Sequence, residues 1–270
     1  MAQFRSPANV LSIAGSDPSG GAGVQGDLKT FAALGCYGMA AISALTVQNT
    51  QGVLAVQTVE PDFLDAEIEA IFADIKVDAV KIGMLGSVAN VEAVRAVLAR
   101  WKPRYVVLDP VLVPTRGAPL SAEGLAQALV AHLLPLANVV TPNLPEARQL
   151  AGFEGTPLAL AHALLGAGAK AVLVKGGHAD VPGESVCDVL VDGEGETSFV
   201  MPRLATSNSH GTGCTLASAI ACGLASGLGL RDAIAAARHF LQEALNAADD
   251  LQVGSGTGHG PLNHFAMRMR

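Results

Sequence analysis

The sequence lacks the clusters of basic residues with which proteins bind nucleic acids. Its 17 Lys and Arg residues are outnumbered by 24 Asp and Glu residues, so the formal net charge is −7. Only 15% of the 270 residues are charged, and they are spread without long runs of one sign. Because a phosphate backbone is bound by clustered Lys and Arg side chains, we expect no nucleic-acid partner.

Cysteine is scarce, and its spacing excludes a zinc or dithiol motif. The cysteines form no CxxC pair; they are Cys36, Cys187, Cys214 and Cys222. In a chain of this size we expect them to be reduced thiols in the cytoplasm. Apart from Cys214, which follows a glycine-rich loop, each is interpreted as a small buried residue.

Long hydrophobic runs are missing as well. The N-terminal residues, MAQFRSPAN, lack the apolar core of a signal peptide. The longest weakly polar run, TLASAIACGLASGLGL, falls short of the ~20 residues that span a bilayer and is rich in Ala and Gly. It therefore favours a buried helix, and we expect no membrane partner. Aromatic residues make up only 4% of the chain, which leaves Met and Val as candidate walls of a binding pocket.

What the sequence has in abundance is an alternation of strand-like and helix-like segments, with half of all residues apolar. Near-continuous apolar runs typical of strands buried on both faces of a parallel sheet occur at 10–14, 39–47, 79–85, 105–111, 138–143 and 171–177. Helical patterns with apolar residues every three or four positions occur at 24–35, 61–75, 88–101, 122–135 and 156–168. This order predicts a sheet with flanking helices.

The last third of the chain departs from that alternation. Two runs around GEGE, within 185–204, predict an antiparallel hairpin at the edge of the sheet. Two helices follow, beginning at about Thr212 and about Leu230. Because no linker, repeat or low-complexity segment interrupts the chain, we expect one domain over residues 1–270.

The first glycine cluster, Gly21-x-Gly23-x-x-Gly26, has the pattern of a dinucleotide-binding fingerprint. That fingerprint places its first glycine directly after the strand and needs an acidic residue about 20 positions later. Here SDPSG separates the strand from the cluster, and no acidic residue lies between Asp27 and Glu60. The sequence therefore disfavours an NAD-dependent oxidoreductase. The glycines can instead form a tight turn, since glycine adopts unusual backbone angles.

The second cluster, SNSHGTGC, leads into the helix expected at Thr212. The first turn of a helix has unpaired N–H groups and the positive end of the dipole, so Gly211, Thr212 and Gly213 predict a phosphate site. A glycine-rich helix start capped by a threonine is the alternative. A thiol in that first turn should have its pKa lowered from about 8.5, which makes Cys214 a candidate proton acceptor.

Several segments of the chain resemble, in order, the motifs of one known family. They are SIAGSDPSGGAGVQGDLKTFAALGCYGMAAISALTVQNT, KIGMLGS, VVLDPVLV, VTPNLPEARQLAG, VLVKGGH, SHGTGCTLASAIACGLA and the tail GPLNHF. Over about residues 10–265 the chain is similar to the hydroxymethylpyrimidine/phosphomethylpyrimidine kinases of thiamine biosynthesis, in the ribokinase-like superfamily. The resemblance implies a three-layer α/β/α sandwich with a mostly parallel sheet and an antiparallel edge. It also implies phosphorylation of 4-amino-5-hydroxymethyl-2-methylpyrimidine by ATP, commonly followed by phosphorylation of the monophosphate.

The resemblance implies the following pyrimidine-binding residues. Gln48 matches the family position whose carboxamide pairs with the aminopyrimidine edge, as Gln pairs with adenine. Asp27 is expected to contact the hydroxymethyl or amino group. Gly15 would let the ring lie close to the backbone, and Met84 would pack on its face. Without the resemblance, Gln48, Asp27 and Met84 would be interpreted as a polar strand end, a surface acid of a helix and a core methionine.

The resemblance also implies a site for ATP and Mg²⁺. Asp109 and Glu146 look like the acids of the family's metal side, and Asn143 belongs to the same motif. Glu146 also fits a capping box at the start of a helix. Lys175 ends a strand and could reach the triphosphate, which the amides of the second glycine cluster, Thr212 included, would hold.

Cys214 stands where most ribokinase-like sugar kinases carry an aspartate base. Between 110 and 121 the sequence departs from its relatives, and Arg116 there could cover the phosphates or be a solvated loop residue. Three alternatives remain: a pyridoxal kinase of the same superfamily, an oxidoreductase, and a pyrimidine-binding protein without activity. The sequence leaves the number of subunits open, a homodimer included.

Overall fold

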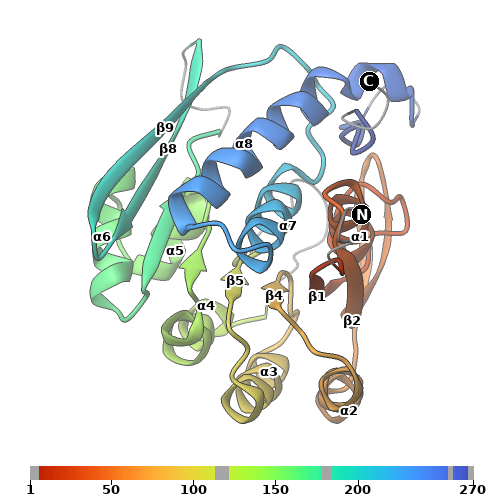
Figure 1. Ribbon diagram of the computed structural model, residues 1–270, viewed down its shortest axis with the longest axis vertical. Coiled ribbons are helices and arrows are strands. Elements are labelled where there is room, and N and C mark those ends of the chain that lie inside the picture. The colour runs from red at the N-terminus through yellow and green to blue at the C-terminus, as the bar shows by residue number, and fades with distance from the viewer. Residues whose placement is uncertain (1–5, 113–121, 178–183, 255–257, 267–270) are drawn as a thin grey trace, which may run out of the picture.

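A nine-stranded sheet runs through the computed structural model, which describes residues 6–112, 122–177, 184–254 and 258–266. The strand order is β3-β2-β1-β4-β5-β6-β7-β8-β9. Six strands form its parallel centre: β2 (Tyr37–Asn49), β1 (Asn9–Gly15), β4 (Ala79–Ile82), β5 (Val106–Leu108), β6 (Val139–Val140) and β7 (Ala171–Val174). The mostly parallel sheet expected from the sequence is confirmed (Figure 1).

Both edges of the sheet are antiparallel. The hairpin expected around GEGE is confirmed as β8 (Ser185–Asp192) and β9 (Gly195–Pro202), with β8 antiparallel to β7. At the opposite edge, β3 (Gly52–Thr58) pairs with β2, and the sequence did not predict this strand. Most of its side chains are partly or fully exposed on both faces, so it has no alternating apolar pattern to announce it.

Helices cover both faces of the sheet. One face carries α2 (Pro61–Asp74), α3 (Val88–Trp101), α4 (Leu125–Ala128), α5 (Leu144–Ala151) and α6 (Pro157–Gly166). The other carries α1 (Gly23–Ala33), α7 (Thr212–Ala225) and α8 (Leu230–Asn246). After α4 the chain continues through a π-helical turn (Leu129–Leu133) and a 3₁₀ turn (Leu134–Leu136), and a 3₁₀ turn (Ala248–Leu251) follows α8. The result is the three-layer arrangement implied by the resemblance.

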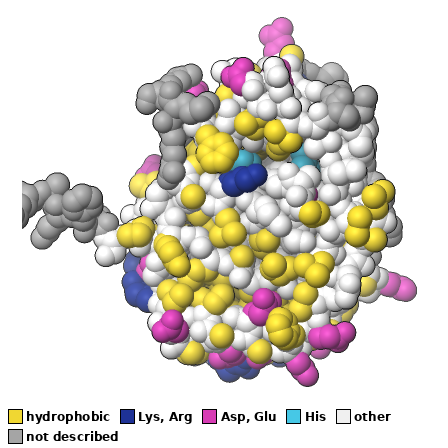
Figure 2. Space-filling model, turned by 90° about the vertical axis from the view of Figure 1, so that its right-hand side faces the viewer, with side chains coloured by type: hydrophobic (Ala, Val, Ile, Leu, Met, Phe, Trp, Pro, Cys, Tyr) yellow, Lys and Arg dark blue, Asp and Glu magenta, His cyan; other side chains and the backbone are white. Residues whose placement is uncertain are grey.

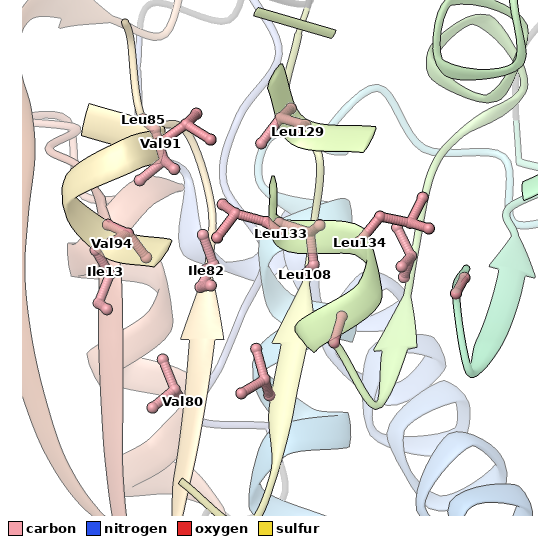
Figure 3. Close-up of a cluster of buried hydrophobic side chains, with 14 of the residues drawn as sticks. Ile13, Val80, Ile82, Leu85, Val91, Val94, Leu108, Leu129, Leu133 and Leu134 are labelled. Carbon is pink, nitrogen blue, oxygen red and sulfur yellow. The ribbon is translucent and has the colours of Figure 1, made fainter. Parts of the chain in front are cut away.

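The core is divided in two by the sheet because successive strand residues face opposite sides. Val80 and Ile82 pack with α3 on one side, as Figure 3 shows, whereas Ala79 belongs to the cluster under α1, α7 and α8. The same alternation recurs in β5, where Val107 faces away from Leu108. Strands buried on both faces are therefore almost entirely apolar, which is why they could be predicted from the sequence.

Figure 2 shows the face that forms the right-hand side of Figure 1, where apolar side chains are gathered. Large apolar residues exposed on β2 and β3 include Leu45, Val47 and Leu54. Among the described residues, no helix is both long and apolar enough to cross a membrane.

Candidate active site

A cavity of about 810 Å³ opens at the carboxyl ends of the parallel strands. In open α/β sheets ligands bind at this edge, because the loops that follow the strands converge there. The cavity is lined by nearly all residues that the sequence analysis singled out: Gly15, Gln48, Met84, Asp109, Asn143, Glu146, Lys175, Gly211, Thr212, Gly213 and Cys214. Segments separated by up to about two hundred residues in sequence thus line the same cavity. Arg116 lies outside the described residues.

Asp27 is the predicted site residue that the structure does not bring to the cavity. Its side chain is fully buried, and Lys81 Nζ lies 2.8 and 3.0 Å from its two carboxylate oxygens. The Oγ atoms of Ser12 and Ser218 donate to the same carboxylate at 2.6 and 2.7 Å. These donors enclose both oxygens, and Asp27 does not line the cavity. It instead joins α1 to β1, β4 and α7 beneath the cavity floor.

Lys81 was missed by the sequence analysis, although a signal for it existed. It is the charged residue of an otherwise apolar strand, AVKI, and it is completely buried. A buried charge needs a partner of opposite sign. Burial alone would lower the pKa of Lys81, but the carboxylate of Asp27 outweighs that effect, so the pKa is raised and the residue stays charged.

Gly15 and Met84 form a matched pair at one end of the cavity. A Cβ atom on Gly15 would lie 2.3 Å from Cε of Met84, so with any other residue at this position the end of the methionine side chain would have to move away from β1. Gln48 lies at the end of β2 and is partly exposed to the same space. The structure therefore gathers a flat backbone surface, a flexible thioether and a carboxamide, which is a suitable lining for a small polar ring.

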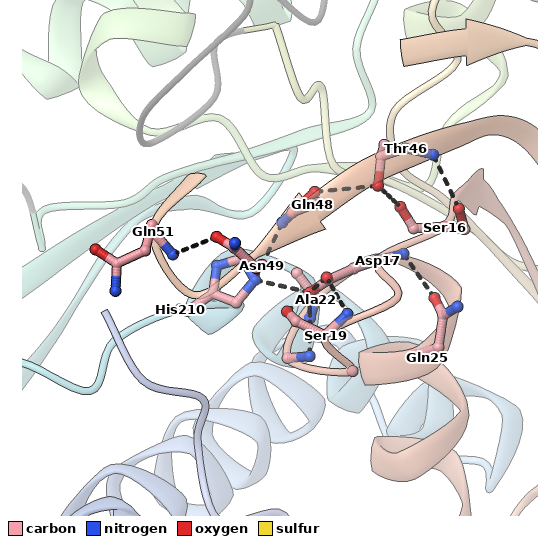
Figure 4. A network of polar contacts seen from close by, with 12 residues as sticks. Ser16, Asp17, Ser19, Ala22, Gln25, Thr46, Gln48, Asn49, Gln51 and His210 are labelled. Atoms are coloured by element: carbon pink, nitrogen blue, oxygen red, sulfur yellow. Dashed lines mark hydrogen bonds and ion pairs between the residues drawn. The ribbon is translucent and has the colours of Figure 1, made fainter. Parts of the chain in front are cut away.

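The loop between β1 and α1 is held by one carboxylate, that of Asp17 (Figure 4). Asp17 accepts hydrogen bonds from the backbone N–H groups of Ser19, Gly21 and Ala22 and from the Ser19 hydroxyl, at 2.7–3.0 Å. It also lies 2.7 Å from His210 Nε2. Burial opposes ionisation, but the hydrogen bonds from His210 and Ser19 lower the pKa of Asp17 to about 2. The sequence analysis assigned no role to this pair.

The two glycine clusters pack against each other. A Cβ atom on Gly211, which has φ 88°, would lie 1.9 Å from the Gly21 carbonyl oxygen. A Cβ atom on Gly21 would in turn lie 2.5 Å from Cδ2 of His210. Both positions therefore require glycine. Gly211 is the N-cap of α7 and has no side chain, so the alternative of a threonine cap is wrong and the first turn stays open toward the cavity.

Beside that first turn lies an ion pair. Lys175 Nζ donates to Asp109 Oδ1 at 2.8 Å, and a Cβ atom on Gly213 would be 3.1 Å from Nζ. Burial alone would lower the pKa of Lys175, but Asp109 and Glu146 raise it, so the amine stays charged. A cation and a set of helix-terminal amides thus converge on one point, as an anion site requires.

Glu146 forms the capping box that the sequence suggested. Its carboxylate accepts from the Asn143 N–H at 2.8 Å, and its own N–H donates to Asn143 Oδ1 at 2.9 Å. Glu146 also lines the cavity, although it is only 3% exposed. Burial and the charge of Asp109 outweigh Lys175 and raise its pKa to about 7. Capping and a role in the cavity are therefore compatible.

Cys214 is in the first turn of α7, as predicted, but its expected acidity is wrong. Burial is the largest effect and raises the pKa of the thiol to about 11, with Asp27 and Asp109 acting in the same direction. Lys81 and a hydrogen bond with the Gly23 backbone oppose this rise without overcoming it. The partial charge of a helix end is therefore outweighed by the cost of burying a thiolate.

Within the described residues, no cluster of three or more His, Cys, Asp or Glu side chains is arranged to hold a metal ion. Asp109 and Glu146 supply two carboxylates near the anion site. One or two carboxylates are the usual protein share of a Mg²⁺ ion that is otherwise bound by water and substrate phosphates. The acids present therefore fit an ion that arrives with a nucleotide.

A family model and curated relatives match almost the whole chain. A family model described as phosphomethylpyrimidine kinase matches residues 17–263. The chain is 48% identical over 263 residues to the hydroxymethylpyrimidine/phosphomethylpyrimidine kinase of Rhizobium meliloti, covering 96% of this chain and 97% of that protein. It is 46% identical over 262 residues to the protein of the same name from Escherichia coli, covering 95% and 97%.

Solved structures show the same fold. An ADP complex of Bacillus subtilis pyridoxal kinase superposes with a TM-score of 0.88 at 34% identity, covering 98% of this chain and 100% of that one. A phosphomethylpyrimidine kinase from Clostridium difficile superposes with a TM-score of 0.77 at 38% identity, covering 88% and 99%.

Proposed function

The chain belongs to the phosphomethylpyrimidine kinase family, and we propose from this premise that it phosphorylates 4-amino-5-hydroxymethyl-2-methylpyrimidine, and then its monophosphate, with ATP. One observation supports this most directly. A single cavity contains a carboxamide suited to a heterocycle, Gln48, and an open helix N-terminus suited to a phosphate, at Gly211. Its volume of about 810 Å³ lies in the range of pockets that enclose a ligand of nucleotide size.

Recognition of the pyrimidine follows from the residues at the end of β1 and β2. The carboxamide of Gln48 offers one acceptor and one donor side by side, which complements a ring nitrogen next to an amino group. The backbone at Gly15 would let the ring lie close to the chain, and the thioether of Met84 would pack against a face of the ring. An aminopyrimidine is thereby read by its polar edge and held by apolar contact with its faces.

Phosphoryl transfer would take place at the start of α7. The amides of Gly211, Thr212 and Gly213 are placed to bind the transferred group, and Lys175 can exchange Asp109 for a phosphate oxygen. Asp109 and Glu146 would hold Mg²⁺, with Asn143 beside them; the ion would neutralise charge on the phosphates. Transfer through a loose transition state depends mainly on this positioning and charge compensation.

Cys214 would orient the attacking hydroxyl. A thiol with a pKa of about 11 is almost entirely protonated at neutral pH, so in the unliganded protein it is a hydrogen-bonding group and a poor base. In a loose transition state the hydroxyl loses its proton late, and early deprotonation adds little. We therefore assign Cys214 a positioning role.

Pyridoxal is the second candidate substrate. Pyridoxal kinases superpose more closely than the phosphomethylpyrimidine kinase above, and one from Staphylococcus aureus in complex with AMP-PCP and pyridoxal has a TM-score of 0.88 at 33% identity. Gln48 favours the aminopyrimidine because pyridoxal has no ring nitrogen next to an amino group.

The free cysteines of the structure fit a reducing, cytoplasmic setting.

The test uses the purified full chain with Mg-ATP and three acceptors: the hydroxymethylpyrimidine, its monophosphate and pyridoxal. Mass spectrometry of the products should show the monophosphate and the diphosphate of the pyrimidine, with slower phosphorylation of pyridoxal. Gln48→Leu should lower kcat/KM for the pyrimidine by about a hundredfold, because it removes both hydrogen bonds to the ring. Binding of the pyrimidine without any phosphorylated product would instead identify a non-catalytic binding protein.

A further inference from the structure

His210 connects four segments that surround the proposed ring pocket. Its backbone N–H donates to the Gly260 carbonyl at 3.1 Å, and the next residue, Gly211, begins the anion site. Its Nε2 atom lies 2.7 Å from Asp17 Oδ2 and 3.3 Å from Gln48 Nε2 (Figure 4). The imidazole is therefore in contact with the one side chain proposed to read the heterocycle.

The contact with Asp17 determines which nitrogen of the imidazole carries a proton. Asp17 is ionised at neutral pH, since its pKa is about 2, so it can only accept hydrogen bonds. At 2.7 Å from that carboxylate, Nε2 of His210 must be the donor. The side of His210 that faces Gln48 is consequently an N–H group and not a lone pair.

Neither atom of the Gln48 carboxamide, as oriented, has a suitable hydrogen-bonding partner in His210 or Thr46. Its nitrogen faces the N–H of His210 at 3.3 Å, so two donors meet. Its oxygen is 3.4 Å from Thr46 Oγ1, whose single proton is already donated to the Ser16 carbonyl at 2.9 Å. A half-turn of the terminal amide would place its oxygen where it can share the Nε2 proton of His210 with Asp17 in a three-centre hydrogen bond, and its nitrogen beside the free lone pairs of Thr46. Oxygen and nitrogen of an amide are assigned from such partners.

We infer that His210 is a specificity-determining positioning residue. In the ligand complex its Nε2–H group keeps the carboxamide oxygen of Gln48 turned toward His210. This inference rests on the proposed function. The edge offered to the ring then has its acceptor next to His210 and its donor next to Thr46. A bound heterocycle must place a donor toward His210 and an acceptor toward Thr46.

This placement of acceptor and donor agrees with the positions of the substituents on the substrate ring. Around the ring of the substrate, the acceptor nitrogen, the amino group and the hydroxymethyl group follow one another. With the amino group on the side of His210, the neighbouring hydroxymethyl group would lie toward Gly211, which follows His210 in the chain and is the N-cap of α7. The opposite orientation of the amide would turn the ring over and point the reacting hydroxyl away from the phosphate site. His210 therefore couples recognition of the ring to the position of the hydroxyl.

The test compares two acceptors that differ at one ring position: the 4-amino compound and its 4-oxo analogue, which has an acceptor and a ring N–H in place of the donor and the ring acceptor. The wild-type chain should prefer the amino compound by about a thousandfold in kcat/KM, because both contacts are mismatched for the analogue. His210→Leu should reduce this ratio by about tenfold or more, since the amide is free to turn. His210→Gln keeps a donor near the position of Nε2 and should retain most of the preference. His239→Leu, at an exposed position of α8, is the matched control and should leave the ratio unchanged.

Each outcome decides between the alternatives. A reduced ratio in His210→Leu, restored in His210→Gln, supports the inference. An equal loss of kcat/KM for both acceptors, or no change for either, refutes it and leaves the proposed function intact. A wild-type chain that phosphorylates neither pyrimidine refutes the proposed function and the inference with it. Thermal unfolding identifies any variant that has lost its fold. If His210→Leu does not fold, His210→Gln is compared with the wild type instead. Loss of the preference for the 4-amino compound in His210→Gln would count against the inference.

Discussion

The unusual thiol of Cys214 gives a prediction that can be tested without substrate. Its pKa is raised from 9.0 to about 11, chiefly because burial disfavours the thiolate. Two units correspond to a hundredfold smaller thiolate fraction at any pH well below both values. Since the thiolate is the nucleophile, and a thiolate of higher pKa is intrinsically more reactive, alkylation of Cys214 by iodoacetamide at pH 7.5 should be slower than that of a free cysteine by about tenfold or more.

The assay follows modification of the peptide that contains Cys214 by mass spectrometry from pH 6 to pH 11. The rate should rise tenfold per pH unit without levelling off below about pH 10. The shape of this profile separates acidity from access, because restricted access lowers the rate equally at every pH. A plateau near pH 8 would refute the reasoning and restore Cys214 as a candidate base. Cys214→Ser should then be compared with Cys214→Ala: a positioning role predicts that serine retains turnover within about tenfold, whereas alanine loses about a hundredfold.

Three further predictions concern the architecture of the site. Gly211→Ala should lower both the midpoint of thermal unfolding and turnover far more than Gly35→Ala; both glycines have positive φ, but a Cβ atom at Gly35 has nothing within 4 Å, so its cost should be only about 1–2 kcal/mol in calorimetry. Asp27→Asn should destabilise the fold by about 3–5 kcal/mol in urea unfolding, because it leaves Lys81 buried without its counter-charge, and a loss under 1 kcal/mol would contradict the ion pair. The lowered pKa of Asp17 contributes stability that is fully present above pH 3.8 and is lost as the pH falls toward 2; this should amount to about 2 kcal/mol, seen as a difference in acid unfolding between the wild type and Asp17→Asn.

Much of the fold and of the candidate site could be predicted because the signals are local. Strands with both faces buried are almost entirely apolar, and their sequence positions follow from that pattern. The capping box joins Asn143 to Glu146 only three residues away, so its pattern is legible in the sequence. Gly211 likewise adjoins the helix that it begins, so the start of this helix is visible in a short stretch of sequence.

The antiparallel strand β3 was missed because it lies at an edge with much of its surface exposed, and so lacks a pattern that periodicity can detect. Asp27 was placed at the ligand by the family resemblance alone. Which side of α1 faces the cavity is decided by packing, and that packing turns the carboxylate toward a lysine 54 residues away.

By itself, then, the sequence determined the layered α/β architecture, the family resemblance and most of the residues around the cavity, since each depends on side chains close together along the chain. Only the tertiary structure decided the electrostatics. Asp17 and His210 are 193 residues apart, and their contact exists only when the two glycine loops meet. The pKa of Cys214 likewise depends on how much water the surrounding elements remove, and a neighbouring helix end cannot reveal this.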